Sequence, residues 1–188
     1  MSTATTCATH LPAAPPAGAF VVRLAEPVEH DDVARLTVAA YTHDYDLHDE
    51  YLASLSQVAE RAAEHDVWVA QDVAGGALVG TVTTPRPGGR LSPLARPGEL
   101  DFRLLGVHPA ARGRGVGALL TRHVVELARR RGYTRVVMNS GPLMVGAHRL
   151  YERLGFARMP EREDRVVPGG TLLAFGLDVT PVPGDAPR

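Results

Sequence analysis

One segment of this chain reads Leu105-Gly106-Val107-His108-Pro109-Ala110-Ala111-Arg112-Gly113-Arg114-Gly115-Val116-Gly117-Ala118. It predicts a strand that runs through a glycine-rich loop into an amphipathic helix, whose buried stripe is Val116, Leu119, Leu120, Val124 and Leu127. Residues without a Cβ let the backbone come close to a ligand, and the free N–H groups that open a helix attract phosphate oxygens. The segment therefore favours an anion site, although glycine-rich turns also serve only to pack a strand against a helix.

Two familiar phosphate-binding schemes do not fit this loop. All 20 positively charged side chains among the 188 residues are arginine, and a P-loop needs a lysine after its last glycine. The missing lysine also excludes Schiff-base and PLP-anchoring chemistry. Gly113, Gly115 and Ala118 match G-x-G-x-x-A, but a dinucleotide site places its glycines directly after the strand and an acidic residue about 20 positions later. The next strand here ends at Met138-Asn139, so we interpret the dinucleotide match as accidental.

Two motifs carry a resemblance to a known family. Arg112 to Gly117 resembles the Q/R-x-x-G-x-G/A signature of the GNAT superfamily of acetyl-CoA-dependent N-acetyltransferases, and Leu105-x-Val107-x-Pro109 resembles its cofactor strand. Downstream, the family's A-x-x-L-Y-x-x-L-G-F helix and exit strand are similar to Ala147-His148-Arg149-Leu150-Tyr151-Glu152-Arg153-Leu154-Gly155-Phe156. Both motifs occur in the family's order with a strand between them. The close resemblance covers 99–157, and the element order of 19–178 is compatible with the same fold.

The resemblance implies that acetyl-CoA is the co-substrate. The loop amides of 113–118 would hold the pyrophosphate of coenzyme A, with two arginines adding contacts to phosphate. The backbone of the preceding strand would pair with the pantetheine arm. The implied cofactor-binding residues are Leu105, Gly106, Val107, Arg112, Gly113, Arg114, Gly115, Val116, Gly117, Ala118 and Tyr151.

The resemblance also assigns a general acid. Tyr151 matches the tyrosine that in many members protonates the departing thiolate of coenzyme A. A phenol with a pKa of about 10 can donate a proton to a thiolate whose thiol has a pKa near 8.5. The alternative is an ordinary core aromatic, because Tyr151 shares a helical stripe with Leu150 and Leu154. One position departs from the family: Met144 stands where an asparagine is often found, which puts in doubt how the cofactor is held there.

Acylation of an amine also requires the loss of a proton, because an alkylammonium has no free lone pair. Alternation along the strand expected at 99–107 places Glu99 and Asp101 on the same face as the cofactor segment. Asp101 aligns with an acidic position often seen in the family, and Glu99 lies two residues further from the thioester. The alternatives are that either carboxylate only pairs with Arg103, or that ordered water takes the proton.

The acceptor site is expected in the segment 41–51, between the first two helices, where the family commonly lines its acceptor pocket. Tyr41, Asp44 and Tyr45 are the candidate substrate-binding residues, and aromatic rings beside carboxylates suit a cationic amine. A solvated loop with acidic residues that cap a helix is the alternative.

The formal charges favour the same division of the molecule. Residues 26–66 carry 11 acidic residues and two arginines, whereas 103–135 carry eight arginines and one acidic residue. These charges match an amine on one side and coenzyme A phosphates on the other. A metal at His43 and His48 is not expected, because no familiar ligand spacing supports it.

Hydrophobic periodicity and turn residues predict a mixed α/β fold with a largely antiparallel central sheet and helices on both faces. The expected strands are 20–24, 67–71, 77–84, 99–107, 134–139, a strand from Phe156 onward and 171–177. Helices are expected from Asp31 to about Ala40 and over 49–64, 114–131 and 144–154. The turn at Gly75-Gly76 predicts an antiparallel hairpin.

The chain is expected to form one domain over 19–179, between disordered tails at 1–18 and 180–188 that hold six of its 15 prolines. Cys7, the single cysteine, lies in the first tail and is expected to take no part in catalysis. Neither a secretory signal nor a run of membrane-spanning length is present, so a cytoplasmic protein without a membrane partner is expected. A net charge of -1 disfavours nucleic acid as a partner, and the oligomeric state is open, a homodimer included.

These observations together predict an enzyme that transfers an acetyl group from acetyl-CoA directly to a primary amine of a small molecule or peptide. Direct attack is preferred to a covalent enzyme intermediate, because Cys7 lies in the tail and no other residue resembles an activated nucleophile. The alternative is a non-catalytic acyl-CoA-binding sensor or regulatory module that has kept the cofactor loop and lost the chemistry.

Overall fold

The computed structural model describes residues 19–182. The strands are β1 (Phe20–Leu24), β2 (His65–Asp72), β3 (Leu78–Pro85), β4 (Glu99–Asp101), β5 (Arg103–Val107), β6 (Arg135–Ser140), β7 (Ala157–Arg158), β8 (Val166–Val167), β9 (Gly170–Thr171) and β10 (Leu173–Asp178). The helices are α1 (His30–Thr42), α2 (Asp49–Ser56), α3 (Val58–Glu64), α4 (Val116–Arg130) and α5 (Val145–Arg153), with 3-10 turns at Pro27–Glu29, Pro109–Ala111 and Pro160–Arg162. The predictions for 1–18, Cys7 included, and for 183–188 lie outside the described residues.

The strands form two four-stranded sheets and the short hairpin of β8 and β9. The first sheet has the order β1-β2-β3-β5 and all its pairs are antiparallel. The second sheet has the order β4-β6-β10-β7, in which β4 and β6 are parallel and the other pairs antiparallel. The predicted mixed α/β fold with largely antiparallel strands is confirmed, and so is the hairpin of β2 and β3.

The single strand expected over 99–107 is wrong, because the chain forms two strands there that belong to different sheets. Asp101 at the end of β4 pairs with β6, whereas Arg103 at the start of β5 pairs with β3. The chain crosses from one sheet to the other at Phe102. The two sheets therefore separate at this point.

A second irregularity follows within β5. Leu104 has a φ of 53°, and the pairing of β5 with β3 shifts register between Thr81 and Thr83. Such an extra residue is typical of a β-bulge, which turns the following side chains to the other face. The predicted alternation of faces from 99 to 107 is therefore also wrong.

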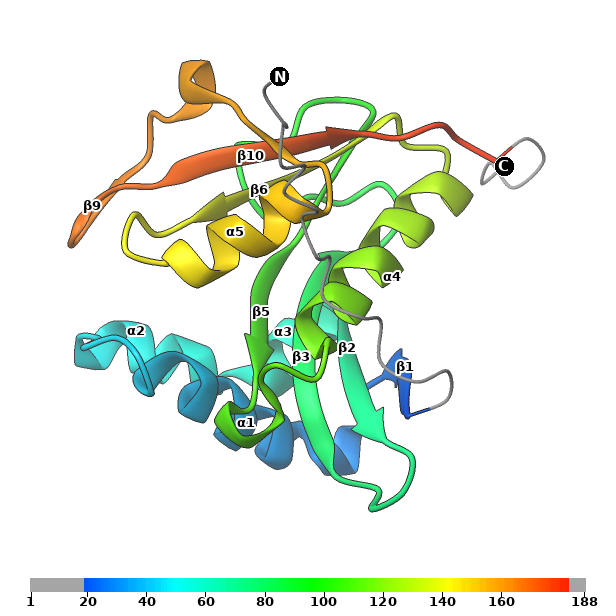
Figure 1. Cartoon of the computed structure of the whole chain (residues 1–188), viewed down its shortest axis with the longest axis vertical. Helices are drawn as coiled ribbons and strands as arrows, with labels where there is room; N and C mark the ends of the chain where they lie inside the picture. Colours follow the sequence, from blue (N-terminus) through cyan, green and yellow to red (C-terminus); the bar gives the residue numbers. More distant parts are fainter. Residues whose placement is uncertain (1–18, 183–188) are drawn as a thin grey trace, which may run out of the picture.

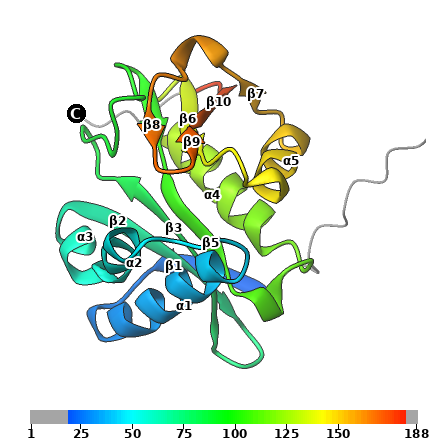
Figure 2. The same cartoon turned by 90° about the vertical axis from the view of Figure 1, so that its left-hand side faces the viewer.

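The helices cover both sides of the first sheet (Figures 1 and 2). α1 contacts β3 and β5, and α3 contacts β2, on one side, whereas α4 contacts β3, β5 and β6 on the other. α5 lies beside β6 and β10 (Figure 1). The predicted helices on both faces are therefore confirmed, with α4 and α5 within one or two residues of the expected bounds.

The helix expected over 49–64 is wrong in one respect, because it consists of two helices, α2 and α3. They are separated by Gln57, whose φ of -76° and ψ of 57° are not helical. The guanidinium of Arg61 donates to the carbonyl oxygens of Ser54 and Leu55 in the last turn of α2. These carbonyls would otherwise lack partners at a helix end.

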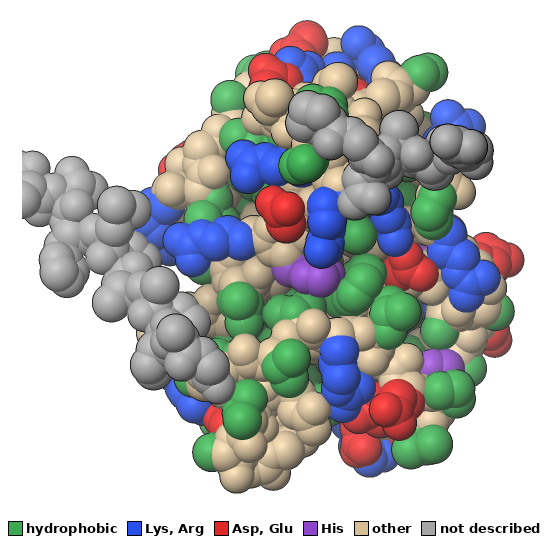
Figure 3. Space-filling view, turned by 90° about the vertical axis from the view of Figure 1, so that its right-hand side faces the viewer, with side chains coloured by type: hydrophobic (Ala, Val, Ile, Leu, Met, Phe, Trp, Pro, Cys, Tyr) green, Lys and Arg blue, Asp and Glu red, His purple; other side chains and the backbone are tan. Residues whose placement is uncertain are grey.

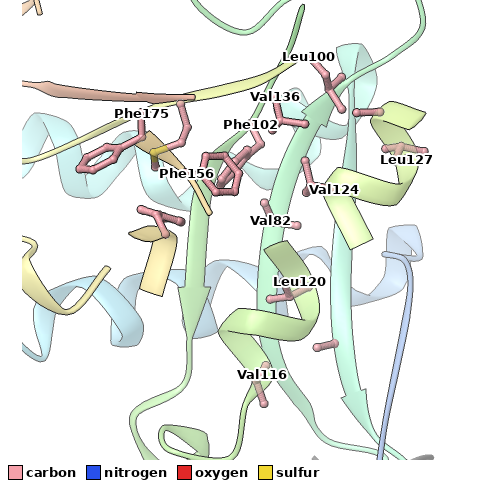
Figure 4. Packing of buried hydrophobic residues seen from close by; sticks show 14 of the residues in the cluster. Val82, Leu100, Phe102, Val116, Leu120, Val124, Leu127, Val136, Phe156 and Phe175 are labelled. Carbon is pink, nitrogen blue, oxygen red and sulfur yellow. The ribbon is translucent and has the colours of Figure 1, made fainter. Parts of the chain in front are cut away.

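The main core lies between α4 and the two sheets (Figure 4). The stripe of α4 contributes Val116, Leu120, Val124 and Leu127, each at most 6% exposed. Phe102, Phe156 and Phe175 fill the region where the sheets separate. Burial of such side chains stabilises the fold by roughly 1.5–3 kcal/mol each. Among residues 19–182, no helix combines the length and the apolar composition that crossing a bilayer would require.

His123 of α4 makes the fold sensitive to acid. Its ring packs against Trp68 at 4.3 Å between centroids with a tilt of 59°, and its Nε2 is buried without a hydrogen-bond partner in the described part of the chain. Burial, followed by the charges of Arg130 and Arg131, lowers the pKa of His123 from 6.5 to about 4. Between these two values the unfolded chain binds a proton that the folded chain does not, so stability falls as the pH drops through this window.

We therefore expect His123→Phe, which keeps a ring against Trp68, to remove most of this pH dependence. Urea unfolding at pH 7 and at pH ~4.5 measures it: the wild type loses stability between the two, and the variant loses much less. An equal loss in both proteins would show that other groups cause the acid sensitivity.

Candidate active site

The separation of the two sheets opens a cavity of about 400 Å³ beside β5. It is lined by β5, the loop before α4 with the first turn of α4, the end of β6, and the inner face of α5. The cavity forms because β5 pairs with β3 while β6 pairs with β4, so no ladder of hydrogen bonds closes the gap between β5 and β6 in the described sheets. Two sequence motifs, the glycine-rich loop and the helix that carries Tyr151, meet in this cavity.

The loop before α4 is shaped by two glycines. Gly113 and Gly115 have φ values of 74° and 82°, a left-handed conformation that favours glycine. Inside α4, the N–H of Leu119 donates to the carbonyl of Gly115 at 2.9 Å. The N–H groups before it, in the first turn, have no intrahelical acceptor. With the helix dipole they can bind an anion, as predicted from the sequence.

The two arginines that were candidates for phosphate contacts are held by carboxylates. Arg112 lines the cavity, but its guanidinium donates to Asp44 at 2.6 Å. Arg114 is not among the lining residues and donates to Asp72 at 2.9 Å. Both side chains tie the loop to acidic neighbours, so the loop amides are the groups best placed to receive phosphate. Every other residue predicted to contact the cofactor lines the cavity: Leu105, Gly106, Val107, Gly113, Gly115, Val116, Gly117, Ala118 and Tyr151.

β5 presents an open edge to the cavity. Gly106 and Val107 pair on one side with Thr81 and Gly80 of β3. The other side of β5 has no strand partner in the described sheets. An unpaired strand edge can hydrogen-bond an extended, amide-containing chain. The edge is thus open for the strand-like contact with pantetheine that the family resemblance implies.

Tyr151 lies in the floor of the cavity. It is 3% exposed, and its ring makes an edge contact with Phe102 at 6.0 Å between centroids. No described residue accepts a hydrogen bond from its hydroxyl, which is therefore free to donate into the cavity. Burial raises the pKa of Tyr151 well above its usual value, so the phenol is protonated at neutral pH.

The two carboxylates proposed as bases line neither this cavity nor the second cavity, which is described below. Asp101 is 1% exposed and accepts hydrogen bonds from the Leu91 N–H at 3.0 Å and the Ser92 hydroxyl at 2.9 Å. Glu99 accepts two hydrogen bonds from Arg162, at 2.7 and 3.0 Å. Their placement does not support either as the base, because the break at Phe102 separates them from the cofactor edge. Neither carboxylate pairs with Arg103, which was the non-catalytic role considered for them from the sequence.

A second cavity of about 490 Å³ adjoins the first. Tyr41 and Tyr45, two of the three candidate acceptor residues, line both cavities. Asp44 lines only the first, and its carboxylate is held by Arg112 and by His43, whose Nδ1 lies at 3.3 Å. The one carboxylate of this segment that lines the first cavity is thus used in contacts within the protein.

In residues 19–182 no three His, Cys, Asp or Glu side chains come together in a group that could hold a metal ion. His48 accepts a hydrogen bond from the Tyr51 N–H and so begins α2. On the face in Figure 3, arginines lie among apolar, polar and acidic side chains.

Several lining residues were not expected from the sequence. Asn139 and Ser140 at the end of β6, Met144 before α5, and Arg103 line both cavities. Arg153 lines the first cavity and Arg165 the second. Arg103 and Arg165 belong to no motif. A signal existed only for Met144, which stands at the family's usual asparagine position.

Comparisons with known proteins agree with this geometry. A sequence profile described as the acetyltransferase (GNAT) family matches residues 30–156. The N-acetylaspartate synthetase of Danio rerio is 39% identical over 72 residues, which are 38% of this chain and 26% of that protein. The glucosamine 6-phosphate N-acetyltransferase 1 of Oryza sativa is 36% identical over 108 residues, 56% of this chain and 61% of that protein. The matched segments thus cover 26% of the length of the first relative and 61% of the length of the second, less than two thirds in each case.

The fold of this chain is also similar to that of a solved structure. An acetyltransferase from Salmonella typhimurium, solved with its cofactor acetyl-CoA, superposes with a TM-score of 0.58 at 22% identity. The superposition covers 91% of this chain and 100% of that chain. The matching profile begins at the start of α1, includes the glycine-rich loop and Tyr151, and ends at Phe156. This chain therefore belongs to the GNAT family of acetyltransferases.

Proposed function

We propose that this protein transfers the acetyl group of acetyl-CoA directly to a primary amine of a small molecule or peptide. The observation that carries the proposal is one cavity in which an anion-binding loop, an open strand edge and a buried phenol meet. The groups present fit coenzyme A: amides for its phosphates, the edge of β5 for its amide-containing arm, and Tyr151 for its sulfur. The names of the two curated relatives also refer to acetylated amines that are small molecules.

Acetyl-CoA supplies the activated acetyl group, whose carbonyl carbon bonds to the amine nitrogen as its bond to sulfur breaks. Tyr151 gives its proton to the departing sulfur and regains one through water from the acylated nitrogen, which must lose its second proton to become an amide. Burial raises the pKa of this phenol, and it also raises the pKa of the coenzyme A thiol when the sulfur lies in the same cavity. The two pKa values therefore stay close enough for the proton to pass from the phenol to the sulfur. The chain's part is to orient the two reactants and to provide this one proton.

The amine must lose its proton, and we propose that water takes it. The carboxylates that line the cavities are Asp44, which is ion-paired, and Asp46. Asp46 lines only the second cavity, so among the described residues no unpaired carboxylate lines the cavity that would hold the thioester.

The test is an assay for coenzyme A release with a panel of amines, together with mass spectrometry of the acetylated products. The chain has no lysine, so acetyl transfer to its own lysine side chains cannot imitate turnover. Release that depends on an added amine supports the proposal. Tight binding of acetyl-CoA without transfer to any amine would instead support the non-catalytic sensor.

The role of the loop has its own prediction. Gly113→Ala adds a Cβ at a φ of 74° with no neighbour within 4 Å, so its effect comes from backbone strain alone. We expect that strain, about 1–2 kcal/mol, to displace the loop amides and raise the Kd for acetyl-CoA roughly five- to tenfold in calorimetry.

Gly88→Ala is the matched control. Gly88 has a φ of 79° and equally open space, but it lines neither cavity. Both variants should lose similar stability, and only Gly113→Ala should bind acetyl-CoA more weakly. Equal Kd values in the two variants would remove the loop from the phosphate site.

A further inference from the structure

The second cavity is continuous with the first through a shared wall. Arg103, Asn139 and Met144 line both cavities. The amine of an acceptor must reach this junction, because the thioester would lie in the first cavity. The rest of the acceptor then extends into the second cavity, whose remaining lining decides which molecules fit.

Two arginines dominate the charge of this second cavity. Arg103 comes from β5, and Arg165 from the segment just before β8. Both are half-buried. Within residues 19–182, neither guanidinium has a carboxylate within 4.0 Å or a hydrogen-bond acceptor, whereas Arg112 and Arg162 are each held by a carboxylate. The charges of Arg103 and Arg165 are therefore available to a ligand.

A third guanidinium strengthens this field. Burial lowers the pKa of Arg61, and the charge of Arg103 lowers it further. Burial raises the pKa of Tyr51, while Arg103, Arg165 and Arg61 oppose that rise. Three positive charges thus act on one tyrosine ring in the wall of the second cavity, and such a positive field favours an anion there.

We propose that the acceptor carries an anionic group, a carboxylate or a phosphate, which Arg103 and Arg165 bind in the second cavity. This inference rests on the proposed function and names the class of its acceptor. A guanidinium donates two parallel N–H groups, a geometry that matches the paired oxygens of either anion. The acceptor is thus held at two points, with its anion toward Arg165 and its amine at the junction.

This assignment differs from the acidic surroundings that the sequence suggested for a cationic amine. The carboxylate of Asp44 is occupied by Arg112, and Asp46 is the acidic residue left in the lining of the second cavity. The selectivity of the cavity therefore depends on the group that accompanies the amine.

The first experiment compares matched pairs of acceptors. One arm pairs amino acids with their carboxamides, and the other pairs amino-sugar phosphates with the unphosphorylated amino sugars. We expect kcat/KM for the anionic member to be roughly 10- to 100-fold higher in one arm, which also identifies the anion. Equal values in both arms overturn the inference while leaving the proposed function intact.

The second experiment removes the charge. Arg165→Gln should raise KM for the preferred anionic acceptor roughly tenfold or more, with little change for its neutral partner and no change in the Kd of acetyl-CoA. Arg165→Lys keeps the positive charge but lacks the two parallel N–H groups, so its KM for the anionic acceptor should lie between those of the wild type and Arg165→Gln. Arg130→Gln, an exposed position at the end of α4, is the control and should match the wild type. An equal loss toward both members of a pair overturns the inference.

Calorimetry keeps the inference testable even if no amine is acetylated. The probe is the same set of acceptor pairs, titrated into the protein saturated with coenzyme A. Binding of an anionic member that weakens in Arg165→Gln supports the anion site although transferase activity fails. No difference between the anionic and neutral members, in a protein that binds coenzyme A, overturns it.

Discussion

We expect Tyr151→Phe to lower kcat by roughly 100- to 10,000-fold, the usual contribution of a positioned general acid, with little change in the Kd of acetyl-CoA. The substitution removes one hydroxyl and keeps the ring. The edge contacts of that ring with Phe102 and Phe175 are therefore retained, and stability should hardly change. Turnover is measured as release of coenzyme A with a saturating amine, and binding by calorimetry.

Tyr133→Phe is the matched control for this prediction. Tyr133 packs against the same core but lines neither cavity, so its hydroxyl can take no part in the reaction. Its variant should turn over at the wild-type rate. If Tyr151→Phe does so too, Tyr151 is only a core aromatic, which was the alternative from the sequence.

The cofactor half of the site could be predicted because its determinants are local in sequence. Gly113, Gly115 and the first turn of α4 follow one another along the chain, and the conformation of such a loop depends on its own residues. The stripe of α5 likewise places Tyr151 inward by helical periodicity alone. These are the parts of the site that the structure places as expected.

In the acceptor half, the positions of Arg103 and of the two carboxylates could not be predicted, because they depend on pairing between distant strands. Alternation put Glu99, Asp101 and Arg103 on one face, but β4 joins β6 and β5 joins β3. Only the partner strands decide where the chain crosses between sheets. Arg165 reaches the second cavity from a segment without helical or strand periodicity, so no pattern marked it.

The division of charge along the chain also acquires a different meaning in three dimensions. Asp44 pairs with Arg112, and Asp66 pairs with Arg131 at 2.7 Å, so two carboxylates of the acidic segment are held by arginines of the basic segment. Among the described residues, the charges in the lining of the second cavity are those of Arg103, Arg165 and the single carboxylate of Asp46, so positive charge is in excess there. The distribution of formal charge along the sequence therefore does not by itself predict the charge that a substrate meets.

Glu99 gives the second large effect, on stability. Its carboxylate and the guanidinium of Arg162 are 9% and 8% exposed. Burial alone would raise the pKa of Glu99, yet hydrogen bonds from Arg162 and from the Arg96 N–H, with the charge of Arg162, lower it. Glu99→Gln leaves the buried guanidinium without a counter-charge, which we expect to cost about 3–5 kcal/mol in urea unfolding.

A surface pair supplies the control for this loss. Glu126 lies 3.8 Å from Arg129 and both side chains are about half exposed, at 51% and 45%. Glu126→Gln should therefore change stability by less than about 1 kcal/mol. A similarly small loss for Glu99→Gln would mean that the buried pair contributes little to the fold.

The double variant Glu99→Gln/Arg162→Met separates a structural role from a catalytic one. It removes both charges, so much of the stability lost in Glu99→Gln should return. If Glu99 only holds Arg162, the double variant keeps the wild-type kcat and the same dependence of kcat on pH. A stable double variant whose kcat falls and no longer rises with pH would restore Glu99 as the base, because only the loss of a titrating group near the amine removes that rise.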